Sequence, residues 1–155
     1  MTTLKIGDKA PAFDSKDQNG KRVKLSDFKG KKVVLFFYPK ASTPGCTVEA
    51  CNLRDHYQVF LHKGYAIIGV SADPEKKQLS FASKYELPFS LLADEEKAVI
   101  NAYGVWGPKK FMGREYDGIH RLSFLIGLDG TISHVFNKFK TKDHHEVVLD
   151  ILNQG

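Results

Sequence analysis

Both cysteines of this 155-residue chain lie in residues 39–51, which read Pro-Lys-Ala-Ser-Thr-Pro-Gly-Cys-Thr-Val-Glu-Ala-Cys. This segment follows the apolar run of residues 32–38, whose β-branched and aromatic content predicts a buried strand, and it opens a long helical pattern. A cysteine can act as a nucleophile when it is present as the thiolate. We therefore expect the chemistry of the protein at this strand-to-helix crossing.

Cys46 is expected in the first turn of the helix. It follows Pro44 by two residues, and proline is favoured at the first helical position. The backbone N–H groups there have no intrahelical partner, and together with the positive helix end they favour a thiolate over a thiol. Thr43 lies three residues before Cys46, where its hydroxyl could cap the helix or contact a ligand held against the sulfur. A cation from elsewhere in the fold would complete such a site.

The spacing of Cys46 and Cys51 constrains how they could bond. In an α-helix, residues five apart are separated by about 7.5 Å along the axis and about 140° around it, so their Cα atoms lie about 8–9 Å apart. A disulfide requires a Cα separation below about 6.8 Å. A disulfide between the two therefore requires the helix to unwind locally.

Less reactive interpretations also fit these residues. A free cysteine is often a small apolar core residue, and Cys51 by itself would be an ordinary cysteine on a helix face. Thr43 by itself could be only an N-cap. The place of Cys46 at a helix start, beside Thr43 and Thr47, favours the nucleophile instead.

Metal and phosphate sites fit the sequence poorly. Structural zinc uses four ligands in closely spaced pairs, whereas the chain has one Cys-x4-Cys spacing and a distant adjacent pair, His144-His145. The other histidines are scattered singly, and the glycines of residues 104–107 lack the residues of a phosphate-binding loop. We expect no metal and no bound cofactor.

Turn and periodicity signals predict an α/β chain. Asn19-Gly20 predicts an N-terminal hairpin. A helix over residues 44–63 carries Val48, Leu53, Tyr57, Phe60 and Leu61 near helical spacing, and Asp73 and Asp94 are expected to cap the next two helices. The further predicted strands are 65–72, 89–92, 120–128 and 131–137, and the further helices are 73–85, 94–103 and 143–152, with Val147, Val148, Ile151 and Leu152 inward.

Residues 104–118 read as a long, glycine-punctuated loop. The order of the other elements predicts parallel first strands and two antiparallel last strands. This order fits a thioredoxin-like α/β fold, with a mixed central sheet flanked by helices and an N-terminal hairpin. We find no linker or repeat, so residues 1–155 are expected to form a single domain.

Composition narrows the class of protein. The 23 basic and 18 acidic residues are dispersed along the chain, which argues against a nucleic-acid binder with its concentrated basic face. No apolar run approaches the roughly 20 residues of a membrane helix, and residues 1–8 lack the features of a secretory signal. We expect a cytoplasmic protein with no membrane association, in which a persistent structural disulfide is not expected.

The central segment resembles the active site of the peroxiredoxins. Pro39-x-x-x-Thr43-x-x-Cys46 matches the pattern of that family, and Thr-Pro-Gly-Cys-Thr followed by Cys51 resembles its peroxiredoxin Q branch, also called bacterioferritin comigratory protein. Residues 36–40, 104–107, 111–113, 116–121 and 144–149 also resemble that branch. The resemblance therefore extends over nearly the whole chain.

The resemblance implies a thiol peroxidase with a thioredoxin-like fold that reduces hydrogen peroxide and organic hydroperoxides without metal, haem or flavin. By position, Cys46 would be the peroxidatic cysteine and Cys51 the resolving cysteine, while Pro39, Thr43 and Arg121 would shape and charge the peroxide site. Glu49 also matches a family position. Without the resemblance, Arg121 would be a surface residue at a strand edge and Glu49 a residue of the helix surface.

Members of the family resolve the oxidised cysteine in different ways. Because Cys51 is present and the chain has no third cysteine, the resemblance implies an intramolecular Cys46–Cys51 disulfide. Thioredoxin or a similar dithiol donor would reduce it, and the branch favours a monomer or weak dimer. Two alternatives stay open: a general disulfide oxidoreductase, which normally carries Cys-x-x-Cys, and a non-enzymatic redox sensor or holdase in which oxidation unwinds the helix.

Overall fold

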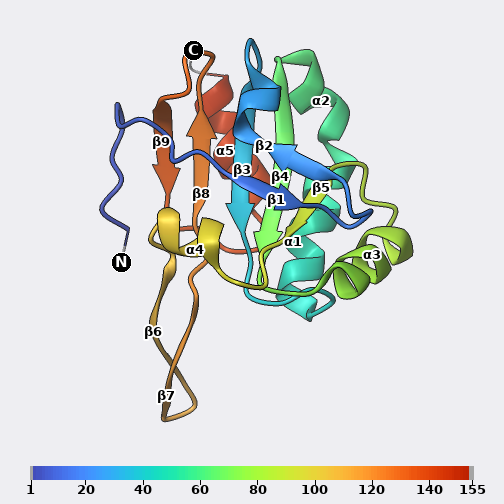
Figure 1. Cartoon of the computed structure of the whole chain (residues 1–155), viewed down its shortest axis with the longest axis vertical. Helices are drawn as coiled ribbons and strands as arrows, with labels where there is room; N and C mark the ends of the chain where they lie inside the picture. Colours follow the sequence, from blue (N-terminus) through green and yellow to red (C-terminus); the bar gives the residue numbers. More distant parts are fainter. Residues whose placement is uncertain (1, 154–155) are drawn as a thin grey trace.

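The computed structural model describes residues 2–153, without the side chain of Phe111. Its centre is a five-stranded sheet in the order β5-β4-β3-β8-β9 (Figure 1). The strands are β3 (Lys32–Phe37), β4 (Tyr65–Ser71), β5 (Ser90–Ala93), β8 (Ser123–Ile126) and β9 (Ile132–Phe136). β3, β4 and β5 run parallel and β8 is antiparallel to β9, as the sequence predicted. β8 also pairs antiparallel with β3.

The position of β3 between two layers explains why residues 33–38 are an unbroken apolar run. Val33, Leu35 and Phe37 pack into the core on one face of the sheet. Val34, Phe36 and Tyr38 pack into the core on the other face. Successive side chains of a strand point to opposite faces, so a strand that is covered on both sides needs apolar residues at every position.

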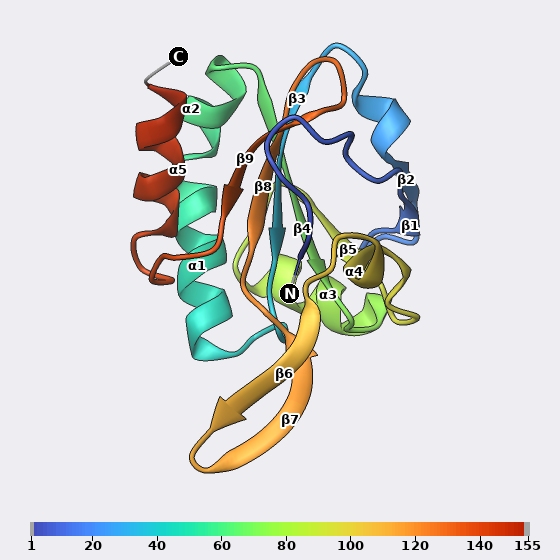
Figure 2. The same ribbon diagram turned by 90° about the vertical axis from the view of Figure 1, so that its left-hand side faces the viewer.

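Helices cover one face of the sheet and a mixed layer covers the other (Figure 2). The helical face carries α1 (Pro44–Asp55), α2 (Tyr57–His62) and α5 (His144–Leu152), and α3 (Glu75–Lys84) adds Phe81 to its core. The opposite face carries the antiparallel N-terminal hairpin β1 (Asp14–Lys16) and β2 (Arg22–Lys24), the 3-10 helix η1 (Leu25–Phe28) and α4 (Ala98–Ala102). This arrangement confirms the predicted fold class and the predicted hairpin.

The single helix predicted over residues 44–63 is wrong, because the chain forms α1 and α2 with a break at His56. His56 has φ −108° and ψ 10°, and its N–H is shared between the carbonyls of Asn52 and Leu53, both at 3.3 Å. Its ring Nδ1 also lies 2.9 Å from the Asn52 carbonyl oxygen. The imidazole therefore competes for the carbonyl that a regular helix would pair with the backbone N–H.

The apolar face predicted for this helix is also partly wrong. Val48 and Leu61 are exposed, at 41% and 43% of their surface. The buried positions of α1 are Cys46, Glu49, Ala50 and Leu53. The inward face of the helix thus carries a sulfur and a carboxylate, so it does not follow an apolar pattern.

The two predicted aspartate caps act differently from the prediction. Asp73 does not cap α3, whose N-cap is Pro74. Its Oδ2 instead accepts hydrogen bonds from the backbone N–H of Ala41 at 2.7 Å and from the Ser71 hydroxyl at 2.6 Å, and so anchors the loop before α1. Lys97 is the N-cap of α4, but Asp94 still accepts the N–H of Ile100 in its first turn at 2.8 Å.

Residues 104–118, predicted as a loop, instead form a projecting hairpin of β6 (Trp106–Phe111) and β7 (Arg114–Ile119) (Figure 1). Met112 and Gly113 connect the strands with φ values of 52° and 79°, as in a type I′ turn. Pro108 lies within β6, and a proline in a sequence argues against a strand because proline is tolerated only at the edge of a sheet. Each strand of this two-stranded sheet is such an edge.

The carboxyl-terminal elements follow the prediction with shorter bounds. β8 begins at Ser123, so His120 and Arg121 precede the strand rather than lying in it. Asp143 is the N-cap of α5, and Val148 is buried on that helix. His144 and His145 are buried beside it, which the apolar pattern did not predict.

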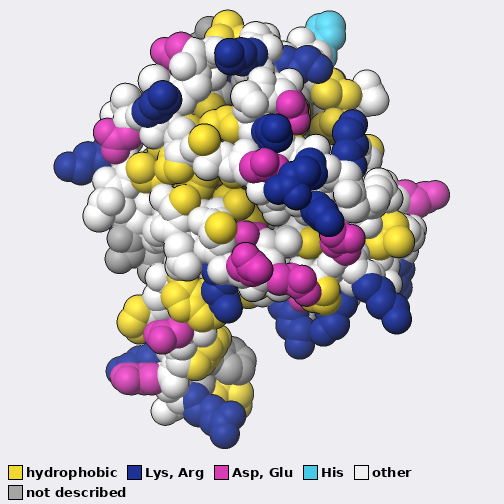
Figure 3. All heavy atoms as spheres, viewed as in Figure 1, with side chains coloured by type: hydrophobic (Ala, Val, Ile, Leu, Met, Phe, Trp, Pro, Cys, Tyr) yellow, Lys and Arg dark blue, Asp and Glu magenta, His cyan; other side chains and the backbone are white. Residues whose placement is uncertain are grey.

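Two features of the structure concern nucleic-acid binding and membrane insertion, the two properties that the sequence argued against. On the face shown in Figure 3, lysine and arginine side chains are interspersed with acidic ones and form no continuous basic strip. Within residues 2–153, no helix is long and apolar enough to cross a membrane.

Gly69 of β4 lies between Phe36 of β3 and Leu91 of β5. A Cβ at Gly69 would lie 2.8 Å from Phe36 Cζ and 2.9 Å from Leu91 Cδ2, in a core where both side chains are fully buried. We predict that Gly69→Ala lowers the free energy of unfolding by about 1–3 kcal/mol, measured by urea denaturation.

Gly127→Ala is the matched control, because its Cβ would meet only Asp129 Oδ1 at 3.4 Å and the Thr131 carbonyl oxygen at 3.7 Å. It should change the free energy of unfolding by no more than about 0.5 kcal/mol. Equal stability of the two variants would contradict the close packing at Gly69.

Candidate active site

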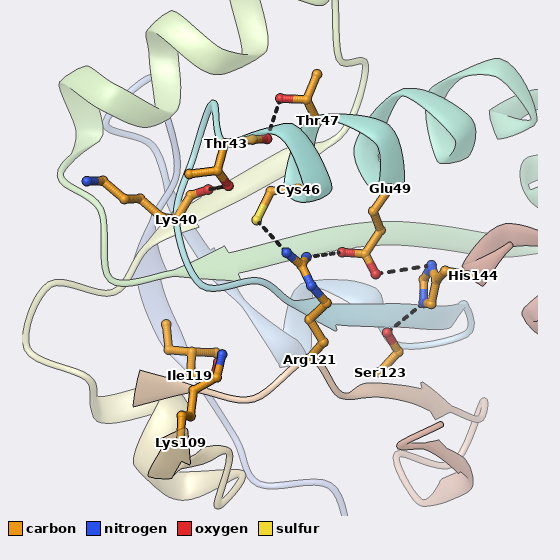
Figure 4. A network of polar contacts seen from close by, with 10 residues as sticks. All are labelled: Lys40, Thr43, Cys46, Thr47, Glu49, Lys109, Ile119, Arg121, Ser123 and His144. Carbon is orange, nitrogen blue, oxygen red and sulfur yellow. Dashed lines mark hydrogen bonds and ion pairs between the residues drawn. The ribbon is translucent and has the colours of Figure 1, made fainter. Parts of the chain in front are cut away.

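Cys46 lies in the first turn of α1, as its spacing from Pro44 predicted. Thr43 is the N-cap residue with φ −82° and ψ 155°, and Pro44 begins the helix. The Cys46 side chain is 1% exposed. Its Sγ accepts a hydrogen bond of 3.2 Å from the guanidinium of Arg121, a residue 75 positions later in the chain (Figure 4). The sequence-predicted cysteine and the sequence-predicted cation therefore meet.

The sheet brings Arg121 to this position. β3 leads through the loop of residues 38–43 into α1, and β8 pairs antiparallel with β3, from Phe36 opposite Ser123 to Val33 opposite Ile126. Arg121 lies just before β8 and therefore beside the end of β3 from which α1 begins. Its side chain is 25% exposed.

Glu49 holds the other side of the Arg121 guanidinium. Glu49 Oε1 accepts a hydrogen bond of 3.2 Å from Nη1, while Nη2 contacts the sulfur (Figure 4). Glu49 follows Cys46 by three residues, so both side chains lie on one face of the helix. Glu49 is fully buried, and the positive charge of Arg121 compensates part of the cost of burying a carboxylate.

Behind Glu49 lies a buried histidine. His144 Nδ1 is 3.5 Å from Glu49 Oε2, and His144 Nε2 is 2.7 Å from the Ser123 hydroxyl. Burial raises the pKa of Glu49 to about 7, although Arg121 acts in the opposite direction. Burial, together with the nearby His145 and Arg121, lowers the pKa of His144 to about 3. The imidazole is therefore neutral, and the carboxyl group titrates near neutral pH.

Thr43 and Pro39 surround the helix start. The Thr43 hydroxyl does not cap α1, because it donates a 2.8 Å hydrogen bond to the Lys40 carbonyl. The Thr43 carbonyl in turn accepts a 2.8 Å hydrogen bond from the Thr47 hydroxyl. Pro39 is half-buried in the loop between β3 and α1. The loop conformation therefore presents Thr43 at the same helix start as Cys46.

Cys51 is half-buried further along α1, and both cysteines are free. α1 is continuous from Pro44 to Asp55, so regular helix geometry separates the two Cα atoms by about 8–9 Å. Burial raises the pKa of the Cys51 thiol, although the neighbouring Arg54 acts in the opposite direction. In this conformation Cys51 is a protonated thiol that is too far from Cys46 to bond with it.

The projecting hairpin contributes a second cation near the site. Lys109 of β6 donates a 2.8 Å hydrogen bond to the Ile119 carbonyl of β7 (Figure 4). Burial and the positive charge of Arg121 lower the pKa of Lys109, whereas Cys46 acts in the opposite direction. The charge of Lys109 therefore interacts with the charges of both Arg121 and Cys46.

Sequence reasoning left Glu49 open and missed His144, Ser123, Lys109 and Gly45. A Cβ at Gly45 would lie 3.0 Å from Arg121 Nη2, so a glycine leaves room for the guanidinium. The sequence indicated that the adjacent His144-His145 pair is a poor zinc site and belongs to the segment 144–149 that resembles the peroxiredoxin Q branch, but it predicted no role for either histidine in the active site. Among the described residues, no three or more His, Cys, Asp or Glu side chains are grouped to hold a metal ion.

Glu49→Gln should make the free energy of unfolding fall more steeply with decreasing pH, because it leaves the effect of the buried His144 uncompensated. Below pH 6.5 the unfolded chain protonates His144, whereas the folded chain does so only near pH 3, so this group lowers stability as the pH falls. Glu49 has the opposite effect: the folded chain protonates it below about pH 7, and the unfolded chain only below about pH 4.5. We predict that from pH 7 to pH 5 the variant loses about 2 kcal/mol more unfolding free energy than the wild type does.

Urea denaturation at the two pH values measures this difference. Glu96→Gln, which changes an exposed carboxylate, is the control and should behave like the wild type. The same pH dependence in Glu49→Gln and the wild type would show that the two buried groups do not titrate as described.

The chain is similar to known proteins over nearly its whole length. The AhpC/TSA family model matches residues 6–135. Peroxiredoxin Bcp of Escherichia coli K12 is 53% identical over 154 residues, which cover 99% of each chain. Peroxiredoxin Bcp of Bacillus subtilis is 47% identical over 150 residues, covering 97% of this chain and 96% of the relative.

Solved structures agree with this assignment. A Xanthomonas campestris peroxiredoxin Q structure matches with a TM-score of 0.87 and 30% identity, covering 99% of this chain and 97% of the other. The peroxidoxin BcpB of Mycobacterium tuberculosis matches with a TM-score of 0.86 and 34% identity, covering 97% of both chains. With its reactive-cysteine geometry and this similarity over its full length, the chain belongs to the AhpC/TSA family, among the peroxiredoxins of the Bcp and peroxiredoxin Q type.

Proposed function

We propose that this thiol peroxidase uses Cys46 as its peroxidatic cysteine and Cys51 as its resolving cysteine. The observation that carries the assignment is the 3.2 Å contact between Arg121 Nη2 and Cys46 Sγ at a helix start. The guanidinium and the unpaired N–H groups of the first turn both favour a negative charge on the sulfur. Cys51 lies beyond the first turn of α1, where the backbone N–H groups are paired within the helix, and its pKa is raised, which supports its assignment to the second role.

In the first step the Cys46 thiolate attacks one oxygen of the peroxide. The S–O bond forms as the O–O bond breaks, and the sulfur is oxidised to a sulfenic acid. The leaving oxygen departs with the electron pair of the O–O bond and takes up one proton, which gives water from hydrogen peroxide or an alcohol from an organic hydroperoxide. Arg121 stabilises the negative charge that develops on the oxygens as the bond stretches.

Thr43 and Pro39 shape the peroxide site in this proposal. The Thr43 hydroxyl hydrogen is engaged by the Lys40 carbonyl, so its oxygen is left as an acceptor for the O–H of a peroxide. Pro39 has no N–H and presents an apolar ring in the loop before the helix. Lys109 adds positive charge at the side of the hairpin.

In the second step Cys51 attacks the sulfenic sulfur. A disulfide forms, and the sulfenic oxygen leaves with a proton as water. Because α1 is continuous between the two cysteines, this step requires the helix to unwind locally. A dithiol donor then reduces the disulfide by thiol exchange and restores both cysteines.

Peroxiredoxins reduce peroxides and are themselves reduced by thiols. For this chain we propose hydrogen peroxide and organic hydroperoxides as substrates, with thioredoxin or a similar dithiol as the reductant. The Xanthomonas campestris bacterioferritin comigratory protein, 29% identical, is described as having alkyl peroxide reduction activity, which supports the organic substrates.

We also propose a cytoplasmic monomer or weak dimer. The two cores pack on one sheet, which supports a single domain, although residues 1, 154 and 155 of its predicted range lie outside the described structure.

The two alternative functions are less well supported. A general disulfide oxidoreductase would normally place its second cysteine three residues after the first, whereas here Glu49 occupies that position. A redox sensor would share the disulfide and the helix unwinding but would not turn over. Turnover therefore separates the sensor from the peroxidase.

Cysteine variants should separate the two steps of the cycle. We predict that Cys46→Ser abolishes peroxide consumption with thioredoxin, thioredoxin reductase and NADPH, because the remaining Cys51 thiol has a raised pKa and lies away from the helix start that favours a thiolate. Cys51→Ser should consume one peroxide per chain and stop as a sulfenic acid, detectable by dimedone labelling and mass spectrometry. Full turnover by Cys51→Ser would refute the resolving role of Cys51, and no turnover by the wild type with any dithiol donor would favour the sensor.

Gly45→Ala should slow the first step without weakening the fold. Its Cβ would lie 3.0 Å from Arg121 Nη2, the nitrogen that contacts the sulfur, so the guanidinium must shift by a few tenths of an ångström. We predict that the rate of Cys46 oxidation falls about tenfold, because small misplacements of charged groups weaken transition-state stabilisation. Stability should not fall, since alanine favours a helix over glycine by up to about 1 kcal/mol.

Stopped-flow oxidation by hydrogen peroxide and urea denaturation measure the two effects. Val48→Ala on the exposed face of α1 is the control and should keep the wild-type rate. An unchanged rate in Gly45→Ala would mean that the position of Arg121 Nη2 does not limit the reaction.

A further inference from the structure

Two buried polar atoms beside the active site face each other without a hydrogen-bond partner. They are Glu49 Oε2 and His144 Nδ1, which lie 3.5 Å apart. The second polar atom of each side chain is already engaged, Glu49 Oε1 by Arg121 and His144 Nε2 by the Ser123 hydroxyl. A buried polar atom without a partner is costly, so a hydrogen between these two atoms is strongly favoured.

Two arrangements of hydrogens give Glu49 Oε2 and both ring nitrogens of His144 a hydrogen bond. With Glu49 ionised, His144 carries its hydrogen on Nδ1 and donates it to Glu49, while Nε2 accepts from the Ser123 hydroxyl. With Glu49 protonated, the carboxyl group donates to Nδ1, and Nε2–H donates to the Ser123 oxygen. Both arrangements use a neutral imidazole, whose two nitrogens exchange their roles.

We propose that His144 is a positioning residue that acts on Arg121 through Glu49, reversing the roles of its two ring nitrogens when Glu49 gains or loses a proton. This inference rests on the proposed role of Arg121 in the peroxidase reaction. The imidazole keeps the Glu49 carboxyl group in one place in both protonation states. Arg121 therefore keeps its contact with the Cys46 sulfur across neutral pH.

The surroundings of the pair support this assignment. The rings of Phe36 and Phe139 pack on His144, at centroid distances of 6.3 and 4.5 Å, and exclude water. The charged and titratable groups that face the pair are Arg121 before β8, Cys46 on α1, and His145 and Asp143 at the start of α5. Glu49 titrates near neutral pH and His144 only far below it, so the carboxyl group gains the proton while the ring stays neutral.

His145 provides a matched control on the same helix. It is also buried, at 7% exposure, but its ring packs on His56 with centroids 4.6 Å apart, and its Nε2 lies 3.9 Å from Glu146. A substitution at His145 therefore disturbs the start of α5 to a similar degree without changing the hydrogen bonds of Glu49.

The first test reads the imidazole directly. In the reduced protein labelled with ¹⁵N-histidine, two-bond ¹H–¹⁵N spectra identify which ring nitrogen of His144 carries the hydrogen. We expect the hydrogen on Nε2 at pH 5.5 and on Nδ1 at pH 8.5. In Glu49→Gln the amide N–H₂ donates to Nδ1 at every pH, so the hydrogen should stay on Nε2. A tautomer that does not change with pH in the wild type would overturn the proposal.

The second test is the rate of Cys46 oxidation by hydrogen peroxide in a single turnover from pH 5.5 to 8.5. His144→Phe removes both nitrogens, and an unpartnered carboxylate costs more than an unpartnered carboxyl group. We expect a loss of about tenfold above pH 7 and a smaller loss below it. His144→Asn, whose amide can turn either its oxygen or its nitrogen toward Glu49, should recover most of the rate, and His145→Phe should keep the wild-type profile.

The Glu49→Gln background separates positioning from a structural effect. There the loss caused by His144→Phe should become independent of pH, because position 49 no longer titrates. A loss that is the same at every pH in both backgrounds would overturn the proposal. If instead the wild type fails to oxidise Cys46, the proposed function fails, while the imidazole spectra, recorded without peroxide, still decide whether His144 changes roles.

Discussion

The site depends on the Arg121 guanidinium, which contacts the Cys46 sulfur with one nitrogen and the Glu49 carboxylate with the other, each at 3.2 Å. Arginine suits this position because its planar group offers several donors in a fixed geometry. The arrangement has an electrostatic cost, since two groups that can be negative share one cation. Burial reduces this cost, because it raises the pKa of Glu49 to about 7. When Glu49 is protonated, the Cys46 thiolate is the only negative group in contact with the guanidinium among these three side chains.

Helix α1 has two opposing requirements. It must be intact to hold Cys46 and Glu49 on one face toward Arg121, yet in the proposed cycle it must unwind before Cys51 can reach the oxidised sulfur. Contacts with α5 hold the intact form: Asn52 Nδ2 donates a 3.1 Å hydrogen bond to the Lys142 carbonyl, and the rings of His56 and His145 pack together. The interruption at His56 ends α1 four residues after Cys51, so unwinding need not extend into α2.

Two further segments position residues around the start of α1. Asp73 follows β4 and holds the backbone of Ala41, which fixes the path of the loop before Cys46. The β6–β7 hairpin projects from the body and brings Lys109 toward the site. Asp73 lies in the connection after β4 and Lys109 in strand β6 of the hairpin, so different segments of the chain meet at the edge of the sheet from which α1 begins.

The sequence by itself determined the location of the chemistry and most of the architecture. The continuous apolar run of β3, Pro44 at a helix start and the Asn19-Gly20 turn are local signals, and each predicted its element. Only the tertiary structure decided that Arg121 meets Cys46, that Glu49 is buried rather than on the helix surface, and that His144 and Ser123 lie behind it. These contacts join residues 75 positions apart for Cys46 and Arg121 and 95 positions apart for Glu49 and His144, so their formation depends on the packing of α1 and α5 on the sheet. The break at His56 and the hairpin at residues 106–119 were missed for a related reason: a side-chain hydrogen bond and a strand pairing, respectively, outweighed the local pattern.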